Sequence, residues 1–140
     1  MTLNDVDAVH DIEKSAYPFP WAKSIFEQAV ASTKHAVVLE TESQICGYAV
    51  VSYVVGEAEL LNICVAPSTQ GSGFGQQLLA YLINHAAQSG NQDMYLEVRI
   101  SNKSAIHLYE KAGFNEVGVR SNYYPTESGR EDAILMALTL

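Results

Sequence analysis

The sequence predicts a mixed α/β (α+β) fold in which helices cover a mixed β-sheet. Segments with apolar residues at helical spacing alternate with segments rich in Val and Tyr, a pattern typical of strands. Some strand segments are separated only by short polar turns and others by a helix, so antiparallel and parallel strand pairs are both expected. The 140 residues are enough for one hydrophobic core, and no linker-like stretch divides them. We therefore expect one domain that spans residues 1–140.

Two helices are expected before the first strand. In the first, over residues 5–16, four apolar side chains recur at helical spacing, and the proline-rich segment 18–21 ends the helix. The second helix follows at residues 22–32. Three strands come next, the first two joined by a polar turn as an antiparallel hairpin and the last closed by a proline: residues 35–40, 45–55 and 57–65.

The second half of the chain begins with a glycine-rich loop, residues 70–75, that opens a helix. Apolar residues form one face of this helix, and Gly90 ends it. In the strand expected at 94–99, alternate residues from Met94 onward are apolar and share one side, so Glu97 points to the other side. The remaining elements are a short helix that Ser101 or Asn102 caps and that ends at Gly113, and strands at 116–121 and 132–140.

The chain is acidic, with 16 Asp and Glu residues against 8 Lys and Arg residues and a net charge of -8. Such a surface repels nucleic-acid phosphates and anionic membranes, and no cluster of basic residues provides a nucleic-acid footprint. No segment is typical of a signal peptide or a transmembrane helix. We therefore expect no nucleic acid and no membrane as partners, a cationic partner, and a monomer.

The two cysteines give a further expectation. Cys46 and Cys64 lie inside apolar runs, with no His or Cys nearby at a spacing that suits a metal. This pattern predicts buried, reduced thiols that pack as small hydrophobic side chains. It suits a cytoplasmic protein without a metal site.

The loop Gln70-Gly71-Ser72-Gly73-Phe74-Gly75 predicts an anion site between a strand and a helix. Backbone amides and the helix dipole favour negative charge at such a place. No Gly-Lys-Ser/Thr sequence closes the loop, and Gln76 stands where the dinucleotide pattern requires its third glycine. A tight turn without a ligand is an alternative. Three alternating glycines exceed what a turn needs and favour a phosphate-bearing cofactor.

Taken together, these segments resemble the GCN5-related N-acetyltransferase (GNAT) superfamily. Gln70, Gly73 and Gly75 match its Arg/Gln-x-x-Gly-x-Gly/Ala motif. Other stretches look like the RimI family of ribosomal-protein-alanine N-acetyltransferases within this superfamily, and the similarity covers nearly the whole chain. They are residues 18–21, 96–102, 105–114, 122–125 and 129–133.

The chain departs from this family at two places. The family usually begins with a strand before the first helix, whereas only Met1, Thr2 and Leu3 are available here, so this strand is expected to be short or absent. Gly71 stands where relatives often carry a basic residue, so one charged contact to the cofactor phosphates is expected to be missing.

The resemblance implies acetyl-CoA as the cofactor, bound between two splayed parallel strands at 57–65 and 93–99, with no metal. It implies backbone contacts with the pantetheine arm, amide contacts with the pyrophosphate, and one contact from the next helix. The residues implied for these three contacts are, in turn, Ile63, Cys64 and Val65; Gly71, Ser72, Gly73, Phe74, Gly75 and Gln76; and Asn102.

The resemblance also implies a catalytic pair, with Glu97 as general base, directly or through a water, and Tyr109 as general acid. From the residues alone, Glu97 could equally be a strand carboxylate that pairs with Arg99. Tyr109 lies seven residues after Asn102, on the same helix face, so both can line one groove. Core packing is the alternative for Tyr109.

The expected acceptor is the N-terminal alanine of a basic ribosomal protein of the small subunit, because RimI enzymes act on such N-termini and this chain is acidic. Tyr123 and Tyr124, on a loop between the last two strands, are expected to frame the peptide, with Trp21 opposite, although loop packing would also explain these residues. Glu13 and Glu131 are expected among the acids at the substrate mouth. Transfer to a small amine or lysine, and an acyl-CoA-binding module without turnover, are the alternatives.

Overall fold

The structure is a computed structural model that describes all residues 1–140, with four α-helices and six strands. In chain order the elements are η1 (Leu3–Asp5), α1 (Val6–Ala16), α2 (Lys23–Ala31), β1 (His35–Thr41), β2 (Gln44–Val54), β3 (Glu57–Val65), η2 (Pro67–Thr69), α3 (Phe74–Gln88), β4 (Asp93–Arg99), α4 (Lys103–Lys111), β5 (Asn115–Thr126) and β6 (Gly129–Thr139). This order confirms the mixed α/β prediction. No helix is long and apolar enough to cross a membrane.

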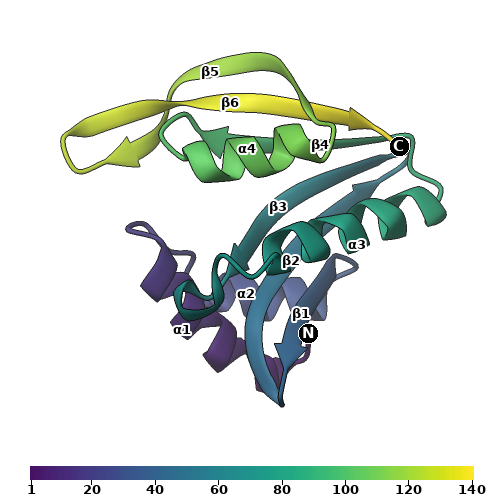
Figure 1. Cartoon of the computed structure of the whole chain (residues 1–140), viewed down its shortest axis with the longest axis vertical. Helices are drawn as coiled ribbons and strands as arrows, with labels where there is room; N and C mark the ends of the chain where they lie inside the picture. The colour runs from purple at the N-terminus through teal and green to yellow at the C-terminus, as the bar shows by residue number, and fades with distance from the viewer.

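All six strands form one sheet in the order β1-β2-β3-β4-β6-β5 (Figure 1). The β3–β4 pair is parallel and the other neighbours are antiparallel, so the sheet is mixed, as predicted. Ahead of α1, Leu3–Asp5 forms a short 3-10 helix, not a strand.

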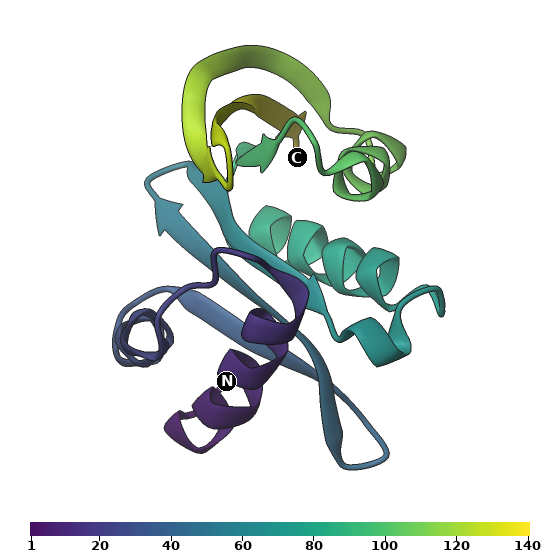
Figure 2. The same ribbon diagram turned by 90° about the vertical axis from the view of Figure 1, so that its left-hand side faces the viewer.

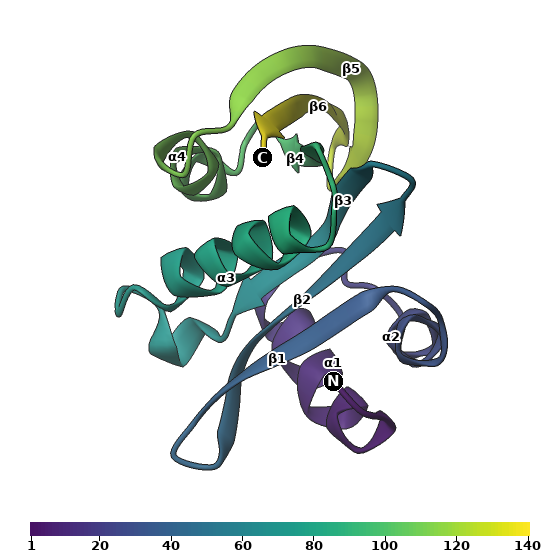
Figure 3. The same cartoon turned by 90° about the vertical axis from the view of Figure 1, so that its right-hand side faces the viewer.

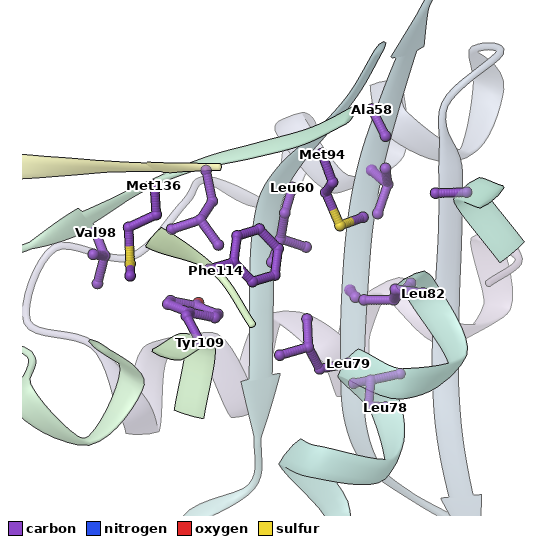
Figure 4. Packing of buried hydrophobic residues seen from close by; sticks show 14 residues of the cluster. Ala58, Leu60, Leu78, Leu79, Leu82, Met94, Val98, Tyr109, Phe114 and Met136 are labelled. Atoms are coloured by element: carbon purple, nitrogen blue, oxygen red, sulfur yellow. The ribbon is translucent and has the colours of Figure 1, made fainter. Parts of the chain in front are cut away.

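Helices α1 and α2 pack on one face of the sheet, and α3 packs on the other (Figures 2 and 3). Strand β2 is buried on both faces, as its nearly continuous apolar sequence requires. Its Ala49 and Val51 join the larger core cluster under α3, whereas Tyr48 and Val50 join the cluster under α1 and α2. In the larger cluster, side chains of α3 meet those of β3, β4, α4 and β6 (Figure 4).

The last two strands are longer than predicted. Residues 122–131 were expected as a loop, but the antiparallel pairing of β5 with β6 resumes at Tyr124–Glu131 and continues to Thr126–Gly129. A register shift between Arg120 and Tyr124, with Asn122 at a φ of 52°, bends β5 without ending the ladder. Tyr124 therefore projects from a strand, not from a loop.

The parallel pair β3–β4 separates halfway along its length (Figure 1). Its register runs only from Glu57–Asp93 to Leu60–Leu96. On the other edge of β3, the register with β2 shifts after Leu60, so that Leu61 is an extra, bulged residue. A bulge bends its strand and increases the twist, which turns residues 61–65 away from β4. The splayed strands expected from the sequence are thus present.

Candidate active site

The separated ends of β3 and β4 leave backbone groups that no neighbouring strand pairs. The Ala66 N–H donates to the Cys46 carbonyl at 2.7 Å, and alternate residues of an antiparallel ladder face the partner strand. By this alternation the backbone of Cys64 faces β2, whereas the backbone groups of Ile63 and Val65 face the cleft. The Val65 carbonyl there accepts the Gln70 side-chain amide at 3.0 Å, and its second lone pair is left for a ligand. Of the three residues expected to offer backbone contacts, two are thus oriented for them, and Cys64 is not.

The glycine-rich loop leads from β3 into α3 and leaves amides free. Gly71 and Gly73 have φ values of 85° and 81°, in the left-handed region that favours glycine. A Cβ on either residue would meet no atom within 4 Å, so backbone conformation, not space, requires glycine here. The first helical bond of α3 runs from the Gln77 N–H to the Gly73 carbonyl, and no acid lies in this turn. The amides before Gln77 can therefore bind an anion.

Asn102 caps helix α4 at the far side of the cleft. Its Oδ1 accepts the Ala105 N–H and the Ser104 hydroxyl, both at 3.3 Å, which confirms the predicted cap. The Nδ2 group of Asn102 makes no hydrogen bond within the chain, so it remains available to a ligand. These features of the loop, the cleft and the cap fit a ligand with a pyrophosphate and an amide-bearing arm.

Tyr109 projects from α4 into the interior and is only 6% exposed. Its ring meets the Phe114 ring edge-on, with centroids 5.9 Å apart (Figure 4). Burial raises the pKa of Tyr109 above its ordinary value, and the neighbouring Tyr124 and Cys64 raise it further. The hydroxyl, which has no hydrogen-bond partner in the chain, therefore stays protonated at neutral pH and is able to donate.

Glu97 points away from the buried side chains of Leu96 and Val98, as predicted. Its Oε1 lies 3.4 Å from Nε of Arg120, so the partner is not Arg99, which the sequence suggested. Arg120 can reach Glu97 because β5 carries it over the same face of the sheet, which sequence separation did not indicate.

A groove of about 410 Å³ lies on the sheet face that Glu97 shares. Its charged lining consists of three carboxylates and one guanidinium: Glu57, Glu59, Glu97 and Arg120. The two acids expected at the substrate mouth, Glu13 and Glu131, are not among the lining residues of this groove. Glu13 is buried and hydrogen-bonded, and Glu131 pairs with Arg99 at 3.2 Å. Hydrogen bonding from Ser101 lowers the pKa of Glu131, and Arg99 lowers it further.

Arg99 joins the α1–α2 loop to the β5–β6 hairpin, a role that the sequence did not suggest. Its Nη1 donates to the Pro125 carbonyl at 2.7 Å, and its guanidinium lies 4.5 Å from the Tyr124 ring centroid and 5.4 Å from that of Phe19. Phe19 belongs to the α1–α2 loop, and Pro125 to the β5–β6 hairpin. The signal in the sequence was the alternation that places Arg99 on the same side as Glu97.

The aromatic residues expected around the acceptor occupy different surroundings. Tyr123 is 43% exposed and meets the Tyr124 ring edge-on at 5.0 Å. Glu97 raises the pKa of Tyr123, and burial raises that of Tyr124 to about 12. Trp21 instead packs against Phe26, with centroids 5.3 Å apart, so its ring belongs mainly to the smaller core cluster. Phe19 and Tyr124 both contact the Arg99 guanidinium.

Comparisons with known proteins agree with this geometry. A sequence model described as "Acetyltransferase (GNAT) family" matches residues 6–114. The [Ribosomal protein bS18]-alanine N-acetyltransferase of Escherichia coli K12 is 42% identical over 140 residues, which cover all of this chain and 95% of the relative. The enzyme of the same name from Haemophilus influenzae is 43% identical over 137 residues, which cover 97% and 93% of the two chains.

Solved structures give the same result. The crystal structure of the ribosomal-protein-S18-alanine N-acetyltransferase from Escherichia coli superposes with a TM-score of 0.94 at 41% identity and covers 99% of this chain and 90% of that chain. A more distant structure, yncA from Salmonella typhimurium with its cofactor acetyl-CoA, has a TM-score of 0.84 at 22% identity and covers 100% and 91%. This distant likeness bears on the fold alone.

Proposed function

The chain belongs to the GNAT family of acetyltransferases, and from this premise we propose that it transfers the acetyl group of acetyl-CoA to the N-terminal alanine of ribosomal protein bS18. The observation that carries the proposal is the 42% identity, over the full chain, to the Escherichia coli enzyme named for that reaction. A ribosomal acceptor would place the reaction in the cytoplasm.

In this proposal, acetyl-CoA lies in the cleft between β3 and β4. Its pantetheine arm pairs with the backbone groups of Ile63 and Val65 that face the cleft, and its pyrophosphate accepts hydrogen bonds from the amides of residues 71–76. Asn102 contributes its free Nδ2 group. The donor thus occupies the side of β4 on which the parallel ladder has ended.

The proposed chemistry is a direct transfer between the two substrates. The amine nitrogen attacks the thioester carbonyl, a C–N bond forms, and the C–S bond breaks. Glu97 takes the proton of the amine through a water, and Tyr109 gives a proton to the departing thiolate. The buried, protonated hydroxyl of Tyr109 supports the second assignment, and the position of Glu97 in an acidic groove supports the first.

A free α-amino group suits this site better than a lysine. With a pKa near 8, roughly a quarter of an α-amine is neutral at pH 7.5, whereas a lysine with a pKa near 10.4 needs about 3 kcal/mol to reach the same fraction. One carboxylate and one water suffice for the α-amine. The groove carries three carboxylates and only one basic side chain, that of Arg120. This excess of negative charge favours an acceptor with cationic residues near its N-terminus.

The direct test is incubation of the protein with acetyl-CoA and a basic peptide that begins Ala-Arg, with thiol release and product mass as readouts. We expect acetylation of this peptide and none of the same peptide with a blocked N-terminus. Failure to acetylate the free peptide, or equal activity on the blocked one, would overturn the proposed acceptor.

The two catalytic assignments are tested by conservative variants. Glu97→Gln and Tyr109→Phe should each lower kcat by about 10²-fold or more, because each removes one proton-transfer group. Matched controls are Glu40→Gln, an exposed carboxylate of β1 outside the groove, and Tyr53→Phe, whose hydroxyl bonds His85. Wild-type kcat in either catalytic variant would refute that assignment.

A further inference from the structure

Glu13 is a buried carboxylate that the proposed reaction does not use. The residue is 2% exposed and is the only charged residue among those buried in the structure. None of the ion pairs of the chain includes it. A carboxylate removed from water without a cationic partner is costly unless hydrogen bonds replace its hydration. The hydrogen-bond partners that replace the hydration of Glu13 therefore indicate its role.

Three elements donate hydrogen bonds to Glu13. Its Oε1 accepts the Tyr48 hydroxyl at 2.5 Å and the Asn62 side-chain amide at 2.9 Å, while Oε2 accepts the Trp21 backbone N–H at 2.8 Å. These donors belong to β2, to β3 and to the α1–α2 loop. One side chain on α1 thus holds the splayed strand β3 and the α1–α2 loop. We call this loop, whose Phe19 contacts Arg99, and the β5–β6 hairpin the acceptor side.

Tyr17, directly after α1, makes a second contact with the same strand. Its hydroxyl donates to the Ile63 carbonyl at 2.8 Å, next to the Asn62 that Glu13 holds. Asn62 and Ile63 are the first two residues after the bulge at Leu61, where β3 leaves β4. The end of α1 therefore fixes β3 at the point where the parallel ladder no longer does.

We propose that Glu13 and Tyr17 are positioning residues of the acetyl-CoA cleft, which hold the separated half of β3 so that Ile63 and Val65 present their backbone to the donor. A carbonyl has two lone pairs, so Ile63 can accept from Tyr17 and still pair with a ligand. Through Trp21, Glu13 also fixes the α1–α2 loop of the acceptor side. This inference rests on the proposed use of acetyl-CoA, but not on the identity of the acceptor.

The test compares Tyr17→Phe with Tyr53→Phe. Both variants lose one tyrosine hydroxyl bond, since Tyr53 bonds Nδ1 of His85 at 2.6 Å, but the second site is remote from the cleft. The readouts are the Kd of coenzyme A by calorimetry, the Tm, and hydrogen exchange of the Ile63 and Val65 amides in the coenzyme A complex, where these amides pair with the ligand. We expect Tyr17→Phe to raise the Kd about 5-fold and to speed exchange at both amides, and Tyr53→Phe to lower only the Tm.

Glu13→Gln supplies an independent arm. An amide can accept from two of the three donors but places an N–H group against the third, so both the coenzyme A Kd and the peptide KM should rise. Unchanged or tighter coenzyme A binding by Tyr17→Phe, or an equal loss in Tyr53→Phe, would overturn the inference. If wild-type protein binds coenzyme A but acetylates no Ala-initiated peptide, only the proposed acceptor fails.

Discussion

Replacement of Arg99 by methionine should loosen the acceptor side of the cleft. Methionine keeps most of the apolar stem but loses the hydrogen bond to Pro125, the ion pair with Glu131 and the stacking on two aromatic rings. A hydrogen bond from a charged group contributes about 1.5–3 kcal/mol and an exposed cation–π contact about 0.5–1 kcal/mol. These values are not additive, so we expect a loss of about 2 kcal/mol.

That loss converts to a measurable shift. With an unfolding entropy of about 2.1 cal/mol/K per residue, a chain of this length should lose about 7 °C in Tm. The peptide KM should rise about tenfold while the Kd of coenzyme A stays constant, because Arg99 joins the loops of the acceptor side. Calorimetric melting and steady-state kinetics with varied peptide give both values.

Lys23→Met is the matched control for Arg99→Met. Lys23 forms an ion pair with Asp7 at 2.7 Å on the exposed surface, where such pairs contribute little to stability because solvent screens them. Its removal should leave the kinetics unchanged. Equal Tm losses in the two variants, or a peptide KM in Arg99→Met like that of the wild type, would show that Arg99 does not hold the acceptor loops.

Three more predictions concern the loop, pH and salt. Gly73→Ala should lower the free energy of unfolding by about 1–2 kcal/mol and weaken coenzyme A binding, because Gly73 has a left-handed backbone. Gly75→Ala should do neither, because a Cβ there would make only ordinary van der Waals contacts. Equal melting curves for the two variants would contradict this prediction. Burial and the adjacent His85 lower the pKa of His35 below its ordinary 6.5. As pH falls, His35 is therefore protonated in the unfolded chain at a higher pH than in the folded protein. The Tm should therefore fall as pH drops below about 6.5, and His35→Gln should flatten this dependence, as melting across pH would show. Added salt should reduce kcat/KM for basic peptides, with a shallower slope in Glu59→Gln; identical slopes would exclude a role for Glu59.

Local patterns were sufficient to predict most of the fold. Periodicity gave the helices and strands, and alternation around Glu97 gave its direction correctly, because both properties depend on neighbouring residues. Glu13 could also have been recognised as buried, since it lies four residues after Val9 on the apolar stripe of α1. The net charge alone led to its assignment as a surface acid.

The remaining features depend on contacts between distant segments. Whether Glu97 pairs with Arg99 or Arg120 is decided by the strand that lies across it, not by distance along the chain. The strand character of Tyr124 arises from pairing with β6 beyond a bulge, in a segment whose Asn and Pro residues are typical of loops. The roles of Glu97 and Tyr109 rest on family resemblance, and the geometry supplies the means to test them.

The short parallel ladder of β3 and β4 has a consequence for stability. Only four residue pairs join the two strands. The two halves of the sheet, β1-β2-β3 and β4-β6-β5, are therefore held together by this short ladder and by the core under α3. A bound acetyl-CoA molecule would form hydrogen bonds with β3 beyond the point where the β3–β4 ladder stops. It would thus replace part of the missing strand pairing. Resistance to unfolding should then rise with coenzyme A or acetyl-CoA concentration, so the cellular supply of acetyl donor would also set the fraction of molecules that is folded.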